Sequence, residues 1–201
     1  TGQISTRYDV ASGEGVFKST DAGQTWQAVG LKDSRHIGAI WIDPKDPQHL
    51  LVSALGHVFG PNDERGVFAT HDGGTTWHRT LFVSADTGAV DIAVDPQDAN
   101  VVFASTWQVR YHPWMSYFTP DVGPESGVYK SIDGGEHWAR VSGGGFPGGD
   151  LGRIGLAATH VGNATRVYAV VDAAKDGIKG TIRQIVQPKV LKLIDSSAQL
   201  P

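Results

Sequence analysis

Four carboxylates in this sequence stand in polar stretches between apolar runs, where they could take part in a reaction. The four stretches differ from one another, and each also carries basic or aromatic side chains. Acid–base cleavage of a glycosidic bond needs two carboxylates, one on either side of that bond. The candidate catalytic residues for this chemistry are Asp33, Asp63, Glu64 and Asp150.

Arginine, histidine and aromatic side chains near these carboxylates suit the binding of a carbohydrate or another small-molecule ligand. Several come from a long, non-repetitive insertion between residues 107 and 126, and loops of this kind often carry function. A protein partner would suit the same loops. The candidate substrate-binding residues are Arg35, His36, Arg110, Tyr111, His112, Trp114 and Arg153.

These residues also have a structural interpretation. Arg35 and Arg153 precede corresponding apolar runs, so both could pair with nearby carboxylates as part of the fold. His112 and Trp114 could pack within their own loop, and residues 63–65 could form a solvated turn. Two hypotheses therefore stand side by side, a hydrolase and a non-catalytic module that binds glycan or protein.

Composition narrows the range of partners. The chain of 201 residues has a formal net charge of −4, which argues against nucleic acid because that ligand calls for a basic surface. No apolar run approaches the roughly 20 residues of a membrane helix, and the first residues lack the blocks of a signal peptide. Cysteine is absent, which excludes disulfides, thiol catalysis and cysteine-based zinc sites.

Motifs for cofactors are weak. Gly143, Gly145 and Gly148 have a dinucleotide-binding spacing, but Pro147 and the lack of a following helix argue against that function. The sequence contains neither an H-E-x-x-H pair nor a G-x-S-x-G elbow. Oxygen-rich loops could hold calcium, although no EF-hand spacing supports it. We expect no required cofactor, and the sequence predicts no metal ligands.

A turn motif recurs three times and organises the chain. Gly15–Trp26 returns as Gly66–Trp77 and as Gly127–Trp138, with glycine, aspartate and tryptophan in the same relative positions. The aspartate can accept hydrogen bonds from N–H groups of the turn, and a glycine can supply a positive φ. The tryptophan can fold its ring over the hairpin. We therefore predict structural roles for Asp21, Trp26, Asp72, Trp77, Asp133 and Trp138.

Short β-rich runs lie between these motifs. Ile37–Asp43 and Leu50–Leu55 precede Gly66–Thr70 and Thr76–Leu81, which predicts four short strands per repeat. Four-stranded units arranged radially form a β-propeller. In such a blade the repeated turn joins strands three and four, so it lies on the face opposite the loops that carry the candidate site residues.

The turn motif resembles the Asp-box, or bacterial neuraminidase repeat, of sialidases, xyloglucan-hydrolysing glycosidases and sortilin-type receptors. Residues 32–38, 54–57, 60–67 and 152–156 also carry a resemblance to bacterial glycosyl-hydrolase-type and sortilin-like repeat proteins. The resemblance covers about residues 10–173. The Arg-Ile-Pro run of sialidases is missing, which argues against sialic-acid chemistry.

This resemblance implies an all-β fold, a β-propeller of four-stranded antiparallel blades with Asp-box turns and about three blades per chain. It implies a glycosidase-like hydrolase with its site on the loop face opposite the Asp-boxes. A glycan- or protein-binding module is the alternative, and a lactone or ester hydrolase with a bound cation is a further one. The resemblance also favours a secreted or periplasmic location.

The blade pattern divides the chain at residue 173. Residues 1–173 would form a half blade, two full blades and another half blade, while residues 174–201 lack a fourth Asp-box. This tail could be a substitute hairpin or an end unrelated to the fold. Three blades do not readily close a ring, and exposed blade edges invite association. We therefore expect a homo-oligomer, specifically a dimer that completes a six-bladed ring.

Overall fold

The chain is all-β in the computed structural model, which describes residues 2, 11–111, 121–173 and 189–193. Within these ranges the one helical element is a 3-10 turn, η1 (Lys32–Ser34). No helix in the same ranges is long and apolar enough to cross a membrane. The predicted site residues His112 and Trp114 lie outside the described residues, as does most of the tail from residue 174.

The strands form four antiparallel sheets that follow one another along the chain. The half-blade contains β1 (Val16–Lys18) and β2 (Gln27–Gly30). Blade 1 contains β3 (Ile37–Ile42), β4 (Leu50–Ala54), β5 (Gly66–Thr70) and β6 (His78–Leu81). Blade 2 contains β7 (Thr87–Val94), β8 (Val102–Gln108), β9 (Gly127–Ser131) and β10 (Ala139–Arg140). The end blade contains β11 (Leu151–Val161), β12 (Ala164–Ala173) and β13 (Lys189–Leu193).

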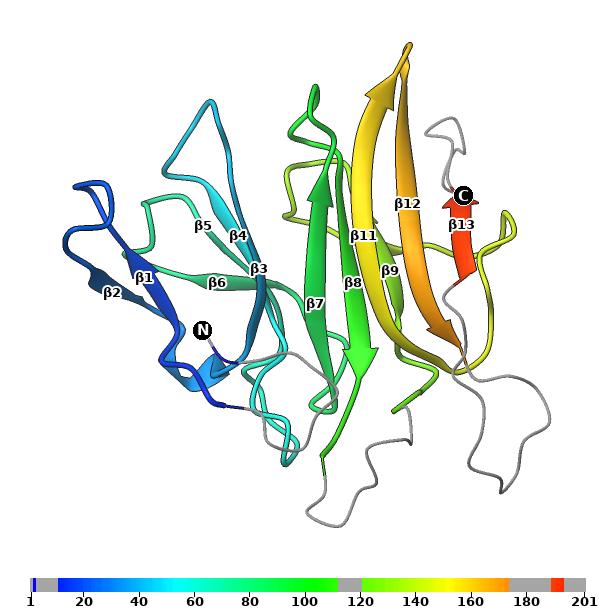
Figure 1. Ribbon diagram of the computed structural model, residues 1–201, viewed down its shortest axis with the longest axis horizontal. Coiled ribbons are helices and arrows are strands. Elements are labelled where there is room, and N and C mark those ends of the chain that lie inside the picture. The colour runs from blue at the N-terminus through cyan, green and yellow to red at the C-terminus, as the bar shows by residue number, and fades with distance from the viewer. Residues whose placement is uncertain (1, 3–10, 112–120, 174–188, 194–201) are drawn as a thin grey trace.

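The four sheets stand side by side from the half-blade to the end blade (Figure 1). In blades 1 and 2 each strand pairs with the next strand in sequence. The β3–β4, β7–β8 and β11–β12 turns point to the top of Figure 1, and the β4–β5 connection points to the bottom. We name these ends the turn face and the loop face. This is the blade architecture of a β-propeller, and it confirms the predicted fold class.

Two consecutive residues of β5 pack at two different junctions between blades. Val67 packs with Ala89 and Val102 of blade 2, whereas the next residue, Phe68, packs with Val16 of the half-blade. Neighbouring residues face opposite sides of a sheet, so a strand between two blades is apolar on both sides. This explains why β5 is buried along its whole length.

Two glycines allow blades 1 and 2 to approach closely. A Cβ atom added to Gly38 would lie 2.1 Å from the carbonyl oxygen of Val90. One added to Gly88 would lie 2.4 Å from the carbonyl oxygen of Leu55. Real Cβ atoms do not tolerate such separations, so any larger residue would push the two strands apart.

Each repeated turn is held by its aspartate. Oδ1 of Asp72 accepts the Thr76 N–H at 2.9 Å and the Thr70 hydroxyl at 2.7 Å, while Oδ2 accepts the Thr76 hydroxyl at 2.6 Å. These hydrogen bonds, the Thr76 hydroxyl first, hold the pKa of Asp72 well below its usual value. Asp21 and Asp133 accept bonds from the corresponding positions of their own turns.

The observed strands differ from the predicted ones at β6 and in the tail, and β3 and β4 each end one residue earlier than predicted. Strand β6 begins at His78 rather than Thr76, because the Thr76 N–H bonds to Asp72 and not to the sheet. In the tail, β13 pairs with β12 as the third strand of the end blade. The other half of the predicted substitute hairpin lies outside the described residues.

Candidate functional site

The first group of predicted residues surrounds η1 on the loop face. Asp33 and Arg35 are exposed, and Arg35 has a φ of 56°, a left-handed conformation that is uncommon for a residue other than glycine. His36 is fully buried, and its Nδ1 donates to the Gly56 carbonyl at 3.0 Å. Burial lowers the pKa of His36, so the imidazole is neutral. His36 therefore holds the loop from inside through Nδ1, while its Nε2 is buried with no hydrogen-bond partner among the described residues.

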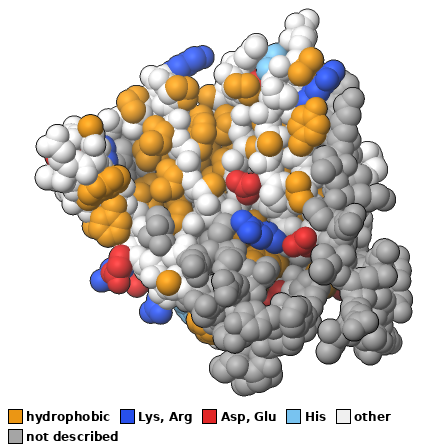
Figure 2. Space-filling view, in the orientation of Figure 1, with side chains coloured by type: hydrophobic (Ala, Val, Ile, Leu, Met, Phe, Trp, Pro, Cys, Tyr) orange, Lys and Arg blue, Asp and Glu red, His pale blue; other side chains and the backbone are white. Residues whose placement is uncertain are grey.

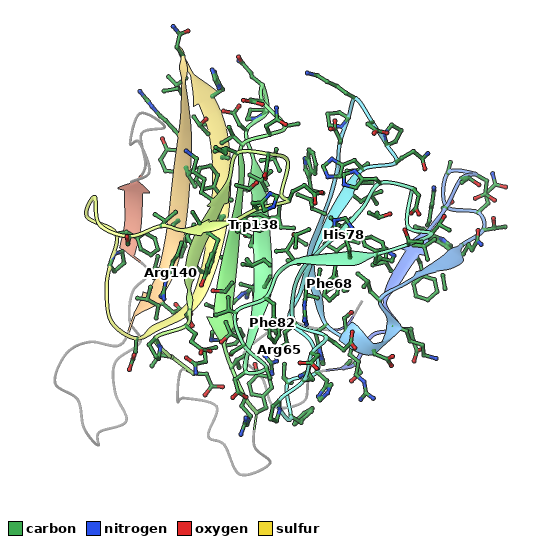
Figure 3. The ribbon with its side chains drawn as sticks, turned by 180° about the vertical axis from the view of Figure 1, so that it is seen from behind. Arg65, Phe68, His78, Phe82, Trp138 and Arg140 are labelled. Atoms are coloured by element: carbon green, nitrogen blue, oxygen red, sulfur yellow. The ribbon has the colours of Figure 1, made fainter. Side chains whose placement is uncertain are left out.

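The second group lies in the β4–β5 connection. Asp63 is exposed and Glu64 is half-buried. Beside them, Arg65 is fully buried at the loop-face end of blade 1 (Figure 3). Its Nη2 donates to the carbonyl oxygens of His57 at 3.2 Å and Val109 at 3.1 Å. Burial lowers the pKa of Arg65 to about 10. Arg65 therefore links the β4–β5 connection of blade 1 to the residue that follows β8 in blade 2.

The third group follows β8 and meets the start of β7. Nη2 of Arg110 forms an ion pair with Oδ1 of Asp86, and both side chains are partly exposed. Tyr111 is buried, and its N–H donates to the Val58 carbonyl at 2.7 Å. Burial, followed by the charge of Asp121, raises the pKa of Tyr111 to about 12. Tyr111 therefore stays protonated at neutral pH.

The fourth group lies at the start of β11. Asp150 is exposed and Arg153 is half-buried. Burial raises the pKa of Asp172, and the positive charge of Arg153 offsets part of this rise. The charge of Arg153 also acts on Tyr111. Arg153 is therefore close to the group formed by Tyr111 and Asp121.

An open cavity of about 320 Å³ lies beside the third group on the loop face. A larger hollow, of about 570 Å³, lies between the half-blade and the Asp72 turn, away from the candidate catalytic and substrate-binding residues. The size of the loop-face cavity is at the lower end of the range of small-ligand sites, about 300–1,000 Å³. Two carboxylates and one guanidinium line it together with the end of β8 and the segment that precedes β9. The lining residues are Asp86, Gln108, Val109, Arg110, Asp121 and Val122.

Only one predicted site residue, Arg110, lines this cavity among the residues that the structure describes. The four predicted carboxylates do not line it, and they come from three separate loops. Sequence reasoning missed Asp86 and Asp121. Asp86 directly precedes β7 and Asp121 lies between β8 and β9, and neither belongs to a sequence motif that would have marked it.

The backbone of Asp121 is held in place by a buried aromatic residue. The indole N–H of Trp107 donates to the Asp121 carbonyl at 2.8 Å, and Trp107 is almost fully buried. On the other side of the cavity, the Val109 N–H donates to the Asp86 carbonyl at 3.1 Å. These bonds connect the backbones of the two acidic residues to β8 and the residue after it, which gives the cavity a fixed framework.

The half-blade and the end blade form the two flanks of the molecule. They expose apolar side chains at positions that a neighbouring blade covers elsewhere in the repeat. Phe68 is 9% exposed in blade 1, but Phe17, its equivalent in the half-blade, is 43% exposed. Tyr168 and Val170 on the outer side of β12 are exposed as well. Figure 2 shows hydrophobic side chains gathered on one face of the molecule. Exposed apolar areas of this kind are typical of contact surfaces.

No family model and no curated protein matches this sequence. Among solved structures, the chain is similar to an ancestral GH74 enzyme, with a TM-score of 0.53 and 18% identity over 78% of this chain and 20% of that one. It is also similar to the GH74 xyloglucanase from Xanthomonas campestris (TM-score 0.49, 14% identity, 79% and 26% covered). A third similar structure is YCF48 from Cyanidioschyzon merolae (TM-score 0.41, 18% identity, 82% and 42% covered). The chain spans about a fifth of the first of these proteins, and that likeness is one of β-propeller fold.

Proposed function

We propose that this chain forms the blades of an Asp-box propeller of the glycoside-hydrolase-like type and binds a carbohydrate on its loop face. The observation that carries the proposal is the 320 Å³ cavity that Asp86, Arg110 and Asp121 line. The propeller fold is compatible with many activities, so fold alone does not decide the function. The proposal therefore depends on the chemistry of the cavity.

The lining groups suit a ligand rich in hydroxyl groups. The carboxylates of Asp86 and Asp121 can accept hydrogen bonds from two hydroxyls, and the guanidinium of Arg110 can donate to a third oxygen. Phe59, in the β4–β5 connection, is 53% exposed and its ring lies 6.2 Å from that of Tyr111. Tyr111 directly follows the cavity residue Arg110, so the exposed ring of Phe59 near it offers an apolar surface on which a sugar ring can stack.

Glycoside cleavage is the second candidate function, and one observation favours it. Asp86 and Asp121 line the same cavity, as the two carboxylates of a glycosidase must. Asp86 forms an ion pair with Arg110, which holds its carboxylate in place at the cavity, where it would act as the base or nucleophile. On this proposal Asp33, Asp63, Glu64 and Asp150 have no catalytic role. Lactone or ester hydrolysis with a bound cation stays an untested prediction.

The repeated turns belong to the scaffold in this proposal. The carboxylates of Asp21, Asp72 and Asp133 are occupied by hydrogen bonds from their own turns. They lie on the turn face, away from the cavity. A carbohydrate-binding function would also fit the secreted or periplasmic location that the family resemblance favours.

The experiment that tests the proposal is a binding screen with soluble polysaccharides, such as xyloglucan, mixed-linkage β-glucan and galactomannan. In affinity electrophoresis, the protein should migrate more slowly through a gel that contains at least one of these polysaccharides. Release of reducing sugar from the same polysaccharide would separate cleavage from binding. Unchanged migration in every polysaccharide would contradict both functions.

We also propose that the exposed flanks associate in a homodimer. In the predicted six-bladed ring, β1 of one chain would pair with the edge of β12 of the other. Within a single chain, β13 pairs with that edge. Ring formation therefore requires β13 to separate from the edge of β12. A dimer that forms through the apolar flank residues does not require this separation, and these residues are Phe17, Tyr168 and Val170.

A further inference from the structure

Three histidines and a glutamate meet on the turn face, between blades 1 and 2. His49 lies in the turn before β4, His71 follows β5, and His78 is the first residue of β6. Glu136 belongs to the repeated turn between β9 and β10, so it reaches the cluster from the neighbouring blade. Figure 3 shows His78 in the upper part of blade 1, far from the loop face where Arg65 lies.

The ligand-type atoms of this cluster are close together. One ring nitrogen of His49, one of His71 and one oxygen of Glu136 all lie within 4.8 Å of one another. Nε2 of His71 is 2.7 Å from Oε1 of Glu136. The rings of His49 and His71 stack with their centroids 4.6 Å apart, so their nitrogen-bearing edges can face the same carboxylate.

His49 provides a second, independent observation. Its Nε2 is buried and has no hydrogen-bond partner among the described residues. A buried polar atom without a partner destabilises a fold unless something unseen satisfies it. The other ring nitrogen, Nδ1, lies 3.9 Å from Oδ2 of Asp43, which leaves Nε2 as the atom available to a ligand.

We propose that Nε2 of His49, Nε2 of His71 and a carboxylate oxygen of Glu136 bind a divalent transition-metal ion. Two imidazoles and one carboxylate form a ligand set typical of Zn²⁺. Around Zn²⁺ the ligand atoms would lie about 2.0–2.2 Å from the ion and therefore about 3.4 Å from one another. Nε2 of His71 and Oε1 of Glu136, now 2.7 Å apart, would separate slightly, while His49 would turn towards them. His71 is exposed and Glu136 is half-buried, so an ion can enter from solvent and a water molecule can take the fourth position.

Neighbouring groups would orient these ligands. His78 is bound to the second oxygen of Glu136, with Nε2 and Oε2 3.1 Å apart, and so fixes the rotation of the carboxylate. Oδ2 of Asp43 lies 3.9 Å from Nδ1 of His49, so a small movement towards the ring would let it accept the Nδ1 proton, the arrangement in which a carboxylate fixes the tautomer of a metal-binding histidine. Both residues are therefore positioning residues in this proposal.

The metal would connect two blades. His49 and His71 belong to blade 1 and Glu136 to blade 2, so binding of one ion bridges the junction that Gly38 and Gly88 make tight. An ion that binds the folded state and not the unfolded state stabilises the protein by mass action. The site is independent of the loop-face cavity.

The test uses the full chain after removal of metal with a chelator. Calorimetric titration with Zn²⁺ should show one ion bound per chain, and equimolar Zn²⁺ should raise the melting temperature. Titration with Co²⁺ should give the intense visible absorption of a four-coordinate site. The substitutions His71→Asn and Glu136→Gln should each lower the Zn²⁺ affinity by about 100-fold, and His78→Gln by about tenfold.

His160→Gln is the matched control. His160 also faces a carboxylate across a blade junction, with its Nδ1 3.0 Å from Oδ2 of Asp95, but it lies outside the cluster. Its Zn²⁺ affinity should equal that of the wild type. The proposal is overturned if the wild-type chain binds no Zn²⁺ at micromolar concentrations, or if H71N and E136Q, shown to be folded by circular dichroism, bind it as tightly as the wild type.

Discussion

Trp138 donates its indole N–H to the hydroxyl oxygen of Thr80 at 3.1 Å as well as to the Gly135 carbonyl of its own turn at 2.9 Å, and the bond to Thr80 joins the third repeated turn to the fourth strand of the preceding blade. Trp77 makes the equivalent link to the Val29 carbonyl at 2.7 Å. Trp26 holds the same place in the first turn, but it bonds only within that turn and is 63% exposed. The repeated tryptophan therefore acts as a link between blades wherever a preceding blade is present.

Substitution of Trp138 by Phe should lower the free energy of unfolding by about 1–2 kcal/mol, because the hydrogen bond to Thr80 is lost and the junction packs less well. Trp26→Phe is the matched control and should cost less than about 0.5 kcal/mol, since among the described residues the Trp26 indole bonds within its own turn alone. Urea unfolding followed by circular dichroism would measure both. Equal losses in the two variants would show that the tryptophan acts within its own turn.

A second pair of variants tests the close approach between β3 and β7. Gly38→Ala should destabilise the fold by about 1–3 kcal/mol, because the new methyl group would overlap the Val90 carbonyl of the next blade. Gly155 follows an isoleucine in the end blade just as Gly38 does in blade 1, but a Cβ atom there meets nothing within 4 Å. Gly155→Ala should therefore leave the melting temperature unchanged or slightly raised. A loss as large as that of G38A would contradict this explanation.

The blade strands are predictable because their pattern repeats and because their burial on both sides makes them continuous apolar runs. The predicted strand Gly66–Thr70 has its observed bounds for this reason. The predicted start of β6 is too early, since the side chain of Asp72 competes with the sheet for the Thr76 N–H. Such competition depends on side-chain geometry, which strand propensity does not describe.

The candidate site is harder to predict. Asp86 and Asp121 stand far apart in the sequence, and the pairing of β8 with both β7 and β9 brings their segments to one cavity. The cluster of His49, His71 and Glu136 escapes sequence analysis as well, because a metal site assembled from two blades has no short spacing motif. Residues that a fold assembles from distant segments leave little signal in one sequence.

Stability should fall in acid through Asp95 at the junction of blade 2 and the end blade. Burial alone would raise the pKa of Asp95, but hydrogen bonds from Thr165, the Gln97 N–H and His160 outweigh it and lower the pKa to about 2. A carboxylate with a depressed pKa in the folded state stabilises the protein above its unfolded pKa, near 3.8, and this stabilisation is lost as the pH falls towards 2.

The melting temperature, measured between pH 5 and about 2, should therefore fall more steeply with decreasing pH in the wild type than in Asp95→Asn. The variant should have a lower melting temperature at pH 5, because a neutral amide at this position accepts fewer of these hydrogen bonds than the carboxylate does. Parallel declines in the two proteins would mean that other carboxylates govern the acid limit.

Association through the flanks is testable by light scattering. Both the full chain and a chain ending at residue 173 should form dimers, and the shorter chain should dimerise at lower concentration, because β13 no longer competes for the β12 edge. Phe17→Ser should weaken dimerisation in both forms, since it removes an exposed aromatic ring from the flank. A monomeric mass for both chains at high concentration would contradict association.

The most direct test of the proposed function is the affinity of the Arg110→Ala variant for whichever polysaccharide binds the wild type. Arg110 lines the cavity and holds Asp86 in place, so its loss should weaken binding by about tenfold or more, equal to about 1.4 kcal/mol. Arg166→Ala removes an exposed arginine of β12 outside the cavity lining and should bind as the wild type does. If R110A also binds as tightly as the wild type, the loop-face cavity is not the carbohydrate site.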